Sequence, residues 1–196
     1  MTHGKTSLAL LGFCAALPLL ATAAPADPEA WVVESRALAD QLTVQLKAEL
    51  QQAMQAAGPV AAIEVCRTRA PEIAARLGRE SGAQVGRTAL RVRNPANAPD
   101  DLERQVLQQF AEQLASAPAA PASPPEAVFE LRTPRGVEHR YLRAIPMQPL
   151  CVTCHGKTIA PDIAAAIRTA YPEDAATGFE PGELRGAVTV RWPVAN

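Results

Sequence analysis

The stretch VFELRTPRGVEHRYLRAI, residues 128–145, decides the fold class. Its two halves, 128–131 and 137–145, carry β-branched and aromatic residues and flank Thr133-Pro134-Arg135-Gly136, a sequence typical of a tight turn. Together they predict a β-hairpin. A further strand is predicted over Leu184–Trp192, where apolar residues alternate at positions 188, 190 and 192.

Helices are predicted on the N-terminal side of this hairpin. Asp27-Pro28 has the N-cap and proline pattern of a helix start, and Gly58-Pro59 ends that helix and begins another. Residues 100–115 predict a third helix, in which Asp100 and Glu103 are spaced as a capping box. Helices followed by antiparallel strands indicate an α+β fold. Two shorter elements are also predicted, a strand over Leu90–Arg93 and a helix over Asp162–Ala170.

The pentapeptide Cys151-Val152-Thr153-Cys154-His155 lies between the hairpin and the last strand. Two thiols separated by two residues reach the two vinyl groups of one haem edge, and the histidine that follows folds back to the iron. The motif therefore predicts one covalently attached c-type haem. Cys151 and Cys154 would form the thioethers, and His155 would be the proximal axial ligand.

The N-terminus predicts export, which haem c attachment requires. Lys5, an apolar run over residues 8–20 and the small residues Ala21-Thr22-Ala23 are typical of a cleaved signal peptide. The run is short for a membrane span, which needs roughly 20 residues, and an uncleaved anchor is the alternative. Cys14 would leave with the signal. Residues 24–196 are then predicted to form a single periplasmic domain, with no later membrane span.

The charge balance disfavours nucleic acid as a partner. Removal of residues 1–23 deletes Lys5 and no acid, so the 19 Lys and Arg fall to 18 against 20 Asp and Glu. A slightly acidic domain lacks the basic patch that binds a phosphate backbone. Residues 117–125, rich in Ala, Pro and Ser, are predicted to be a solvated loop.

The ligand on the other face of the iron decides the function. The candidates are the remaining sulfur and imidazole groups Cys66, Met54, Met147 and His139. Met147 precedes Cys151 by only four residues, which makes the far face hard to reach. Met54 fits the apolar stripe of the first helix and is more typical of a core residue. His139 lies in a strand of mixed polarity, where a solvent-facing side chain is the simpler interpretation.

Cys66 is the one cysteine that the haem motif leaves unpaired in the exported chain. Arg67 and Arg69 flank it and would favour the thiolate, the form that binds metals. The alternative is an inert, buried small side chain. A structural zinc site on Cys66, Cys151, Cys154 and His155, or an interaction module without haem, is the alternative to the haem interpretation as a whole.

Several further stretches form a distinctive series, namely AAIEVC at 61–66, VGRT at 85–88, RNPANAPD at 93–100 and PLCVTCHG at 149–156. Together they resemble a bacterial family of c-type haem domains with a PAS-like fold, long catalogued as a domain of unknown function. The resemblance covers nearly all of the chain after the signal, with the loop at 117–125 as a departure. It implies an antiparallel sheet flanked by helices, haem held against it, and His155 and Cys66 as the axial pair.

The predicted function is that of a redox-active haem protein, either an electron carrier or a sensor of redox state or small ligands. Thiolate ligation stabilises ferric iron, so the hypothesis includes a low reduction potential and loosening of Cys66 on reduction. A separate redox or signalling partner protein is expected. A peroxidase-like enzyme is the weakest alternative, because no distal acid–base pair is evident.

Two further expectations concern surfaces. The arginines at 87, 91, 93, 140 and 143, with Lys157, are candidates to neutralise haem propionates, because arginine pairs with carboxylates in bidentate fashion. Apolar residues of the first helix recur in near four-residue steps, so their stripe winds around the helix. A winding stripe suggests more than one contact partner, and a homodimer face is one interpretation.

Overall fold

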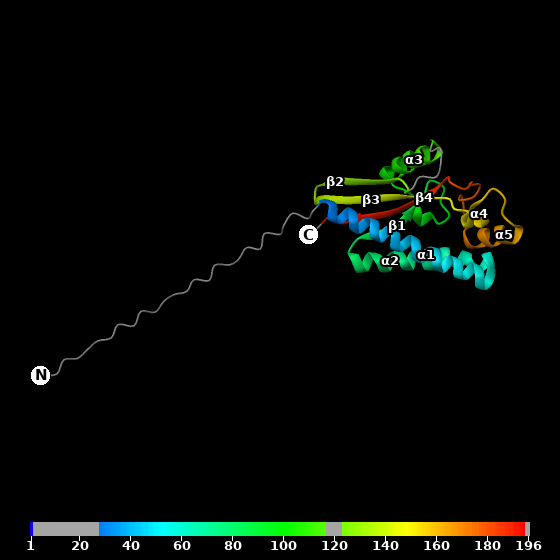
Figure 1. Ribbon diagram of the computed structural model, residues 1–196, viewed down its shortest axis with the longest axis horizontal. Helices are drawn as coiled ribbons and strands as arrows, with labels where there is room; N and C mark the ends of the chain where they lie inside the picture. The colour runs from blue at the N-terminus through cyan, green and yellow to red at the C-terminus, as the bar shows by residue number, and fades with distance from the viewer. Residues whose placement is uncertain (2–27, 117–122, 195–196) are drawn as a thin grey trace.

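A computed structural model describes residues 28–116 and 123–194, together with Met1. Its centre is an antiparallel sheet of four strands in the order β1-β4-β3-β2 (Figure 1). The strands are β1 Gln84–Thr88, β2 Glu126–Thr133, β3 Gly136–Pro146 and β4 Leu184–Trp192. The α+β class and the antiparallel sheet flanked by helices are confirmed. The hairpin and the last strand also lie where the sequence predicts them.

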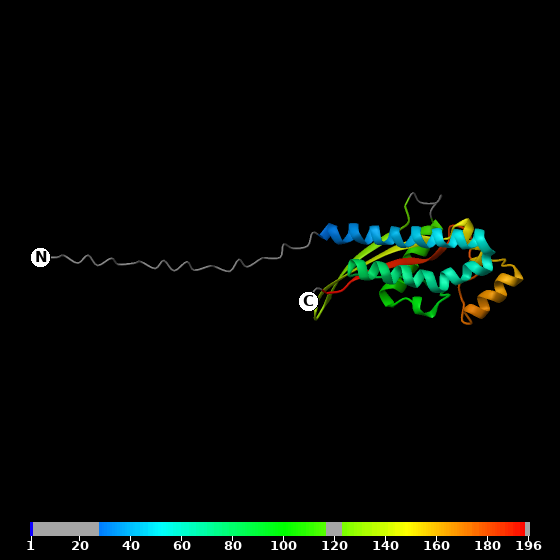
Figure 2. The same cartoon turned by 90° about the horizontal axis from the view of Figure 1, so that it is seen from below.

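The helices cover both faces of the sheet. Alternate residues of a strand point to opposite faces, so Tyr141 packs with Val188 and Val190 on one side, while Leu142 packs on the other. The first face is covered by α1 and α2 and the second by α3, as the two views show (Figures 1 and 2). The helices are α1 Pro28–Glu64, the π-helical segment η1 Val65–Arg69, α2 Ala70–Ser81, α3 Asp101–Ser116, α4 Val152–His155 and α5 Pro161–Ala170, with short 3-10 turns at Pro95–Asn97 and Pro149–Cys151.

The helix α1 contains the predicted break at Gly58-Pro59. Gly58 has φ 78° and ψ −179°, a conformation that glycine adopts without the steric cost of a side chain. Before the break, the winding stripe of apolar residues serves two different surfaces. Leu38 and Leu42 pack in the sheet core, whereas Leu50 and Met54 line a cavity further along. Contacts within the chain therefore account for the stripe, and the homodimer stays a prediction.

The capping box of α3 is confirmed. The Glu103 amide donates to the Asp100 carboxylate over 2.9 Å, and the Asp100 amide donates to the Glu103 carboxylate over 3.2 Å. Glu103 is also buried against β4, where its Oε1 accepts from Thr189 over 2.9 Å and from Arg191 over 2.7 Å. The cap thus fixes both the start of the helix and its position on the sheet.

The predicted strand at Leu90–Arg93 is wrong, because pairing of β1 with β4 ends at Thr88. The alternating pattern belongs to an extended loop in which Leu90 is exposed and Arg93 is buried, the reverse of a strand that packs its apolar side inward. Backbone bonds from Ala89 to Asn97 and from Ala175 to Val92 hold the loop in place of a ladder.

Two predictions fall partly or wholly outside the described residues. The signal peptide at 1–23 does so except for Met1, and the loop at 117–125 does so for residues 117–122. Among the helices that the structure describes, none is long and apolar enough to cross a bilayer.

Candidate haem site

The four predicted site residues line one cavity. It has a volume of about 380 Å³, within the usual range for cofactor pockets, and it lies between α1, η1, the sheet and the segment that carries α4. Cys66 enters it from η1, and Cys151, Cys154 and His155 enter it from the segment 149–155. Residues 85 positions apart in the sequence are thereby brought to one site. Its apolar walls include Leu42, Leu46, Leu50, Ile63, Val92 and Leu150.

The His155 imidazole is prepared to bind a metal. Its Nδ1 donates a hydrogen bond to the carbonyl oxygen of Ala176 over 2.7 Å, which fixes the tautomer. The lone pair of Nε2 is then available to bind a metal ion. Burial, together with the nearby Arg185 and Arg93 charges, lowers the pKa of His155 to about 2. The imidazole is therefore neutral, the form that coordinates metal ions. Phe179 packs edge-on against its ring, with the centroids 6.4 Å apart.

Arg93 holds the backbone around this histidine. Its Nη2 donates to the carbonyl oxygens of Cys154 and Ala176 over 2.6 and 3.3 Å. The same guanidinium forms a bidentate pair with Asp174 at 3.0 and 3.1 Å, and both side chains are only 7% exposed. Arg93 was a candidate for a propionate. The structure instead shows it fixing the carbonyl that orients His155.

Cys66 lies in a π-helical segment, a geometry that is rare and frequently found at functional sites. The segment has a local cause. Pro71 has no amide hydrogen to complete the α-helical ladder, and the preceding amide, that of Ala70, donates to the carbonyl of Val65 five residues back. Cys66 thus reaches the cavity from a π-helical turn.

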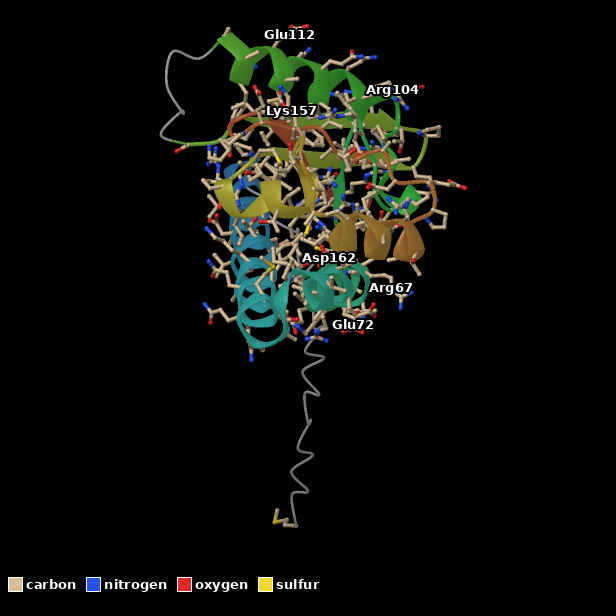
Figure 3. All side chains as sticks on the ribbon, turned by 90° about the vertical axis from the view of Figure 1, so that its right-hand side faces the viewer. Arg67, Glu72, Arg104, Glu112, Lys157 and Asp162 are labelled. Carbon is tan, nitrogen blue, oxygen red and sulfur yellow. The ribbon has the colours of Figure 1, made fainter. Side chains whose placement is uncertain are left out.

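The predicted partners of the Cys66 thiolate are wrong. Arg67, which points outward in Figure 3, pairs with Glu64 at 2.9 Å, and Arg69 pairs with Glu49 at 2.7 Å. Arg87 is one of the arginines that line the cavity with Cys66. Burial lowers the pKa of Arg87, while the negative forms of Cys66 and Tyr171 raise it. A positive charge from β1 therefore lies at the cavity that Cys66 lines.

Of the other axial candidates, Met54 alone shares the cavity. Met147 is buried against Ala176 and Phe179, behind the histidine. His139 lies in β3, where its ring is 4.7 Å from that of Trp31 and its Nδ1 is 3.6 Å from Glu130. Neither of these two side chains lines the cavity.

The candidates for pairing with haem propionates also divide into residues that line the cavity and residues that do not. Arg87, Arg93 and Arg143 line the cavity, and Arg143 pairs there with Asp40 at 2.8 Å. Arg91 lies outside the cavity, Arg140 pairs with Asp100 and Glu138, and Lys157 pairs with Glu180. Sequence reasoning missed Arg185, which lines the cavity from the start of β4 and whose pKa burial lowers to about 10. Its neighbour Gly186 was the available signal. A Cβ there would lie 2.5 Å from the Thr88 carbonyl oxygen, so glycine marks a close approach of two strands.

A zinc site receives no support. Within residues 28–116 and 123–194, no group of three or more His, Cys, Asp and Glu side chains could hold a metal ion. The three cysteines in these ranges, Cys66, Cys151 and Cys154, are free thiols. A neutral histidine, adjacent thiols, apolar walls and several arginines are instead the groups that fit a haem with two carboxylates.

Comparisons with known proteins agree with this arrangement. The solved structure titled "Crystal structure of the cyanobacterial heme-protein Tll0287" is 29% identical with a TM-score of 0.59, and the match covers 87% of this chain and 99% of that chain. No curated protein shows significant similarity. The family model described as Tll0287-like matches residues 28–193. The resemblance inferred from the motifs is confirmed, and the chain belongs to the Tll0287-like family.

Proposed function

We propose that this protein is an exported redox protein with one c-type haem. Cys151 and Cys154 hold the haem covalently, and His155 and Cys66 are the axial ligands of its iron. The similarity to a structure described as a heme protein supports haem binding. The observation that carries the finer proposal is the shared cavity, which receives His155 from one segment and Cys66 from another.

Each group has a distinct task in this proposal. Haem supplies one-electron redox chemistry when it is bound. The Ala176 carbonyl keeps the proton of His155 on Nδ1, so that Nε2 faces the cavity. Arg87 and Arg185 supply positive charge at the cavity wall for carboxylates. The apolar walls exclude water, which strengthens these electrostatic interactions.

Sensing is the second candidate function, and the π-helical segment favours it. A π-helical turn inside α-helix is a local irregularity that frequently occurs at functional sites. Movement of η1 would withdraw Cys66 from the cavity, in which Met54 offers a second sulfur. The protein would then report a change of redox state to a separate partner protein through the position of η1. A carrier, in contrast, would keep Cys66 in place in both redox states.

The haem and its attachment are tested on the protein purified from a host that matures c-type cytochromes. We expect a Soret band, a pyridine haemochrome spectrum of haem c, and an intact mass that includes one haem after removal of the signal near Ala23. Replacement of Cys151 and Cys154 by Ala should abolish the covalent mass. A colourless protein with bound zinc would contradict the proposal.

Carrier and sensor are separated by absorption and resonance Raman spectra of both redox states. Loss of Cys66 ligation on reduction, with retention of His155, supports the sensor. The same axial pair in both states supports the carrier. Met54→Leu is the matched variant, because it shows whether the second sulfur in the cavity replaces Cys66.

A further inference from the structure

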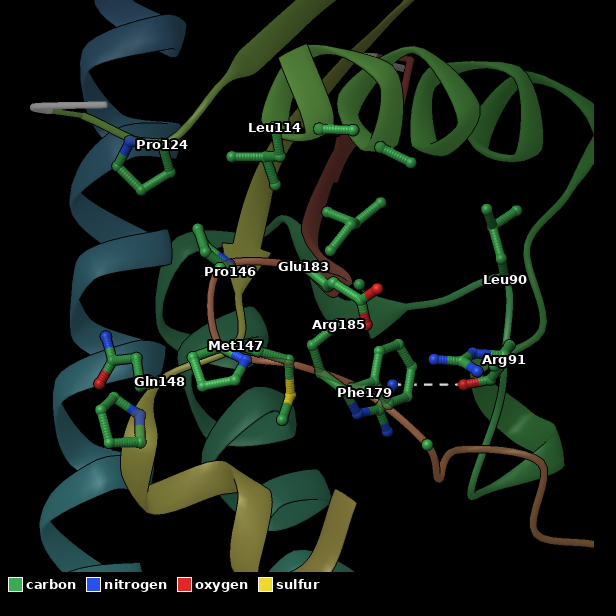
Figure 4. A pocket seen from close by; sticks show the side chains of 18 residues that line it. Leu90, Arg91, Leu114, Pro124, Pro146, Met147, Gln148, Phe179, Glu183 and Arg185 are labelled. Atoms are coloured by element: carbon green, nitrogen blue, oxygen red, sulfur yellow. Dashed lines mark hydrogen bonds between the residues drawn. The ribbon is translucent and has the colours of Figure 1, made fainter. Parts of the chain in front are cut away.

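A second, larger cavity lies beside the haem site. It has a volume of about 1090 Å³ and is an open groove between the C-terminal half of α3, the residues before α4 and the start of β4 (Figure 4). Its lining is largely apolar, with side chains that include Leu90, Leu114, Met147, Phe179 and Leu184. None of Cys66, Cys151, Cys154 and His155 lines it. The groove is therefore distinct from the four residues that would attach the haem and bind its iron, although Arg185 lines both cavities.

An exposed cation marks one wall of this groove. The Arg91 guanidinium carbon lies 3.5 Å from the centroid of the Phe179 ring, and Arg185 lies 5.6 Å from the same ring (Figure 4). Arg91 forms no ion pair with any residue in the described ranges. Glu183, the acid that lines the groove, already accepts a hydrogen bond from the Glu180 amide over 2.8 Å. Two arginines, Arg91 and Arg185, against this one acid leave the groove with a net positive charge beside an apolar surface.

Phe179 joins this surface to the haem site. One face of the ring is covered by Arg91, and the ring meets His155 edge-on at an angle of 81°. Phe179 itself is only 5% exposed, so it is fixed in place between the two. A molecule that pairs with Arg91 would therefore bind on the side of Phe179 that faces away from His155, outside the cavity that Cys66 lines.

We propose that the groove is a binding site for a small organic anion with an apolar body and a single carboxylate-like head. The head pairs with the edge of the Arg91 guanidinium that faces away from Phe179, and the body packs on Leu90, Leu114 and Met147. Charge complementarity selects the anion over a neutral analogue of equal length. The inference goes beyond the proposed redox function and does not rest on the identity of the axial ligands.

Calorimetric titration of the mature holoprotein with decanoate and with decanol tests this site. The two probes have the same chain length and differ in the head, so their ratio isolates the charge. We expect decanoate to bind about tenfold more tightly than decanol. Arg91→Gln should remove that preference, and Leu114→Ser should weaken both probes. Arg79→Gln, an exposed arginine on α2 outside the groove, should change neither.

Equal affinity for the two probes, or an unchanged preference in Arg91→Gln, would overturn the proposal. Loss of the Cys66 spectroscopic signature on addition of decanoate would also overturn it, because the probe would then occupy the haem cavity. Haem content is measured on every sample, so that failure of haem attachment and failure of the groove are separate results.

Discussion

The two sides of the haem cavity are held in very different ways. The proximal side, residues 149–179 around His155, is tied down by buried groups. Arg93 and Asp174 form an ion pair that is 7% exposed on each side, and the amide of Phe179 donates to the carbonyl of His155 over 3.0 Å. The distal side, residues 63–71 around Cys66, combines a π-helical segment with ion pairs at the surface, such as Arg67–Glu64.

This difference assigns rigidity to one of the two proposed ligands, His155, and freedom to the other, Cys66. A buried ion pair that also binds backbone carbonyls resists displacement, because any movement leaves charges without partners. Exposed ion pairs contribute little, since water replaces the lost interaction. We therefore expect His155 to stay in position in all states of the protein, and any change of ligand to occur at Cys66.

The largest effect is expected on removal of the proximal ion pair. Arg93→Ala leaves Asp174 buried and uncompensated, which should lower the free energy of unfolding by about 3–5 kcal/mol. Urea denaturation of the holoprotein measures this loss. Arg67→Ala, which breaks an exposed pair on the distal side, is the control and should unfold like the wild type. Equal losses in the two variants would remove the contrast between the sides.

Two methionines test the same contrast through packing. Met147 is 3% exposed behind the histidine, and its replacement by Ala should cost about 2–4 kcal/mol, because it leaves a cavity in a closed cluster. Met54 is half-buried at the cavity, and Met54→Ala should cost less. The midpoints of chemical unfolding compare the two. A larger loss of stability in Met54→Ala would mean that the distal side is the more tightly packed of the two.

Pro71 tests the origin of the π-helical segment with the smallest expected change in stability. Pro71→Ala restores an amide donor, so an α-helical pattern becomes available to η1. We expect the free energy of unfolding to change by less than about 1 kcal/mol, while the population of Cys66-ligated iron falls. Electron paramagnetic resonance of the ferric protein reports that population. An unchanged spectrum would show that the proline does not determine the placement of Cys66.

Local patterns predicted a large part of this fold. The hairpin at 128–145, the last strand, the break at Gly58-Pro59 and the capping box of Asp100 depend on residues close in sequence, and all are present. The wrong prediction of a strand at Leu90–Arg93 has a different cause, namely contacts with residues that are distant in sequence. Alternation there imitates a strand, but the partners of that loop lie near residues 97 and 175, which periodicity does not reveal.

The sequence predicted which residues form the site better than it predicted how they are arranged. The cysteines and His155 follow from a motif with a fixed chemical purpose, and the structure places them with Cys66 at one cavity. The roles of the arginines depend on burial and on distant partners. Arg93 contacts a carboxylate 81 positions away, and Arg87 lines the same cavity as Cys66 from another element, so neither role has a local signal.

The most direct test of the account is electron paramagnetic resonance of the ferric holoprotein in the wild type, Cys66→Ala and Met54→Leu. We predict a low-spin thiolate signal in the wild type and in Met54→Leu, and its loss in Cys66→Ala with haem content unchanged. The same thiolate-free spectrum in all three proteins would contradict the assignment of His155 and Cys66 as the axial pair.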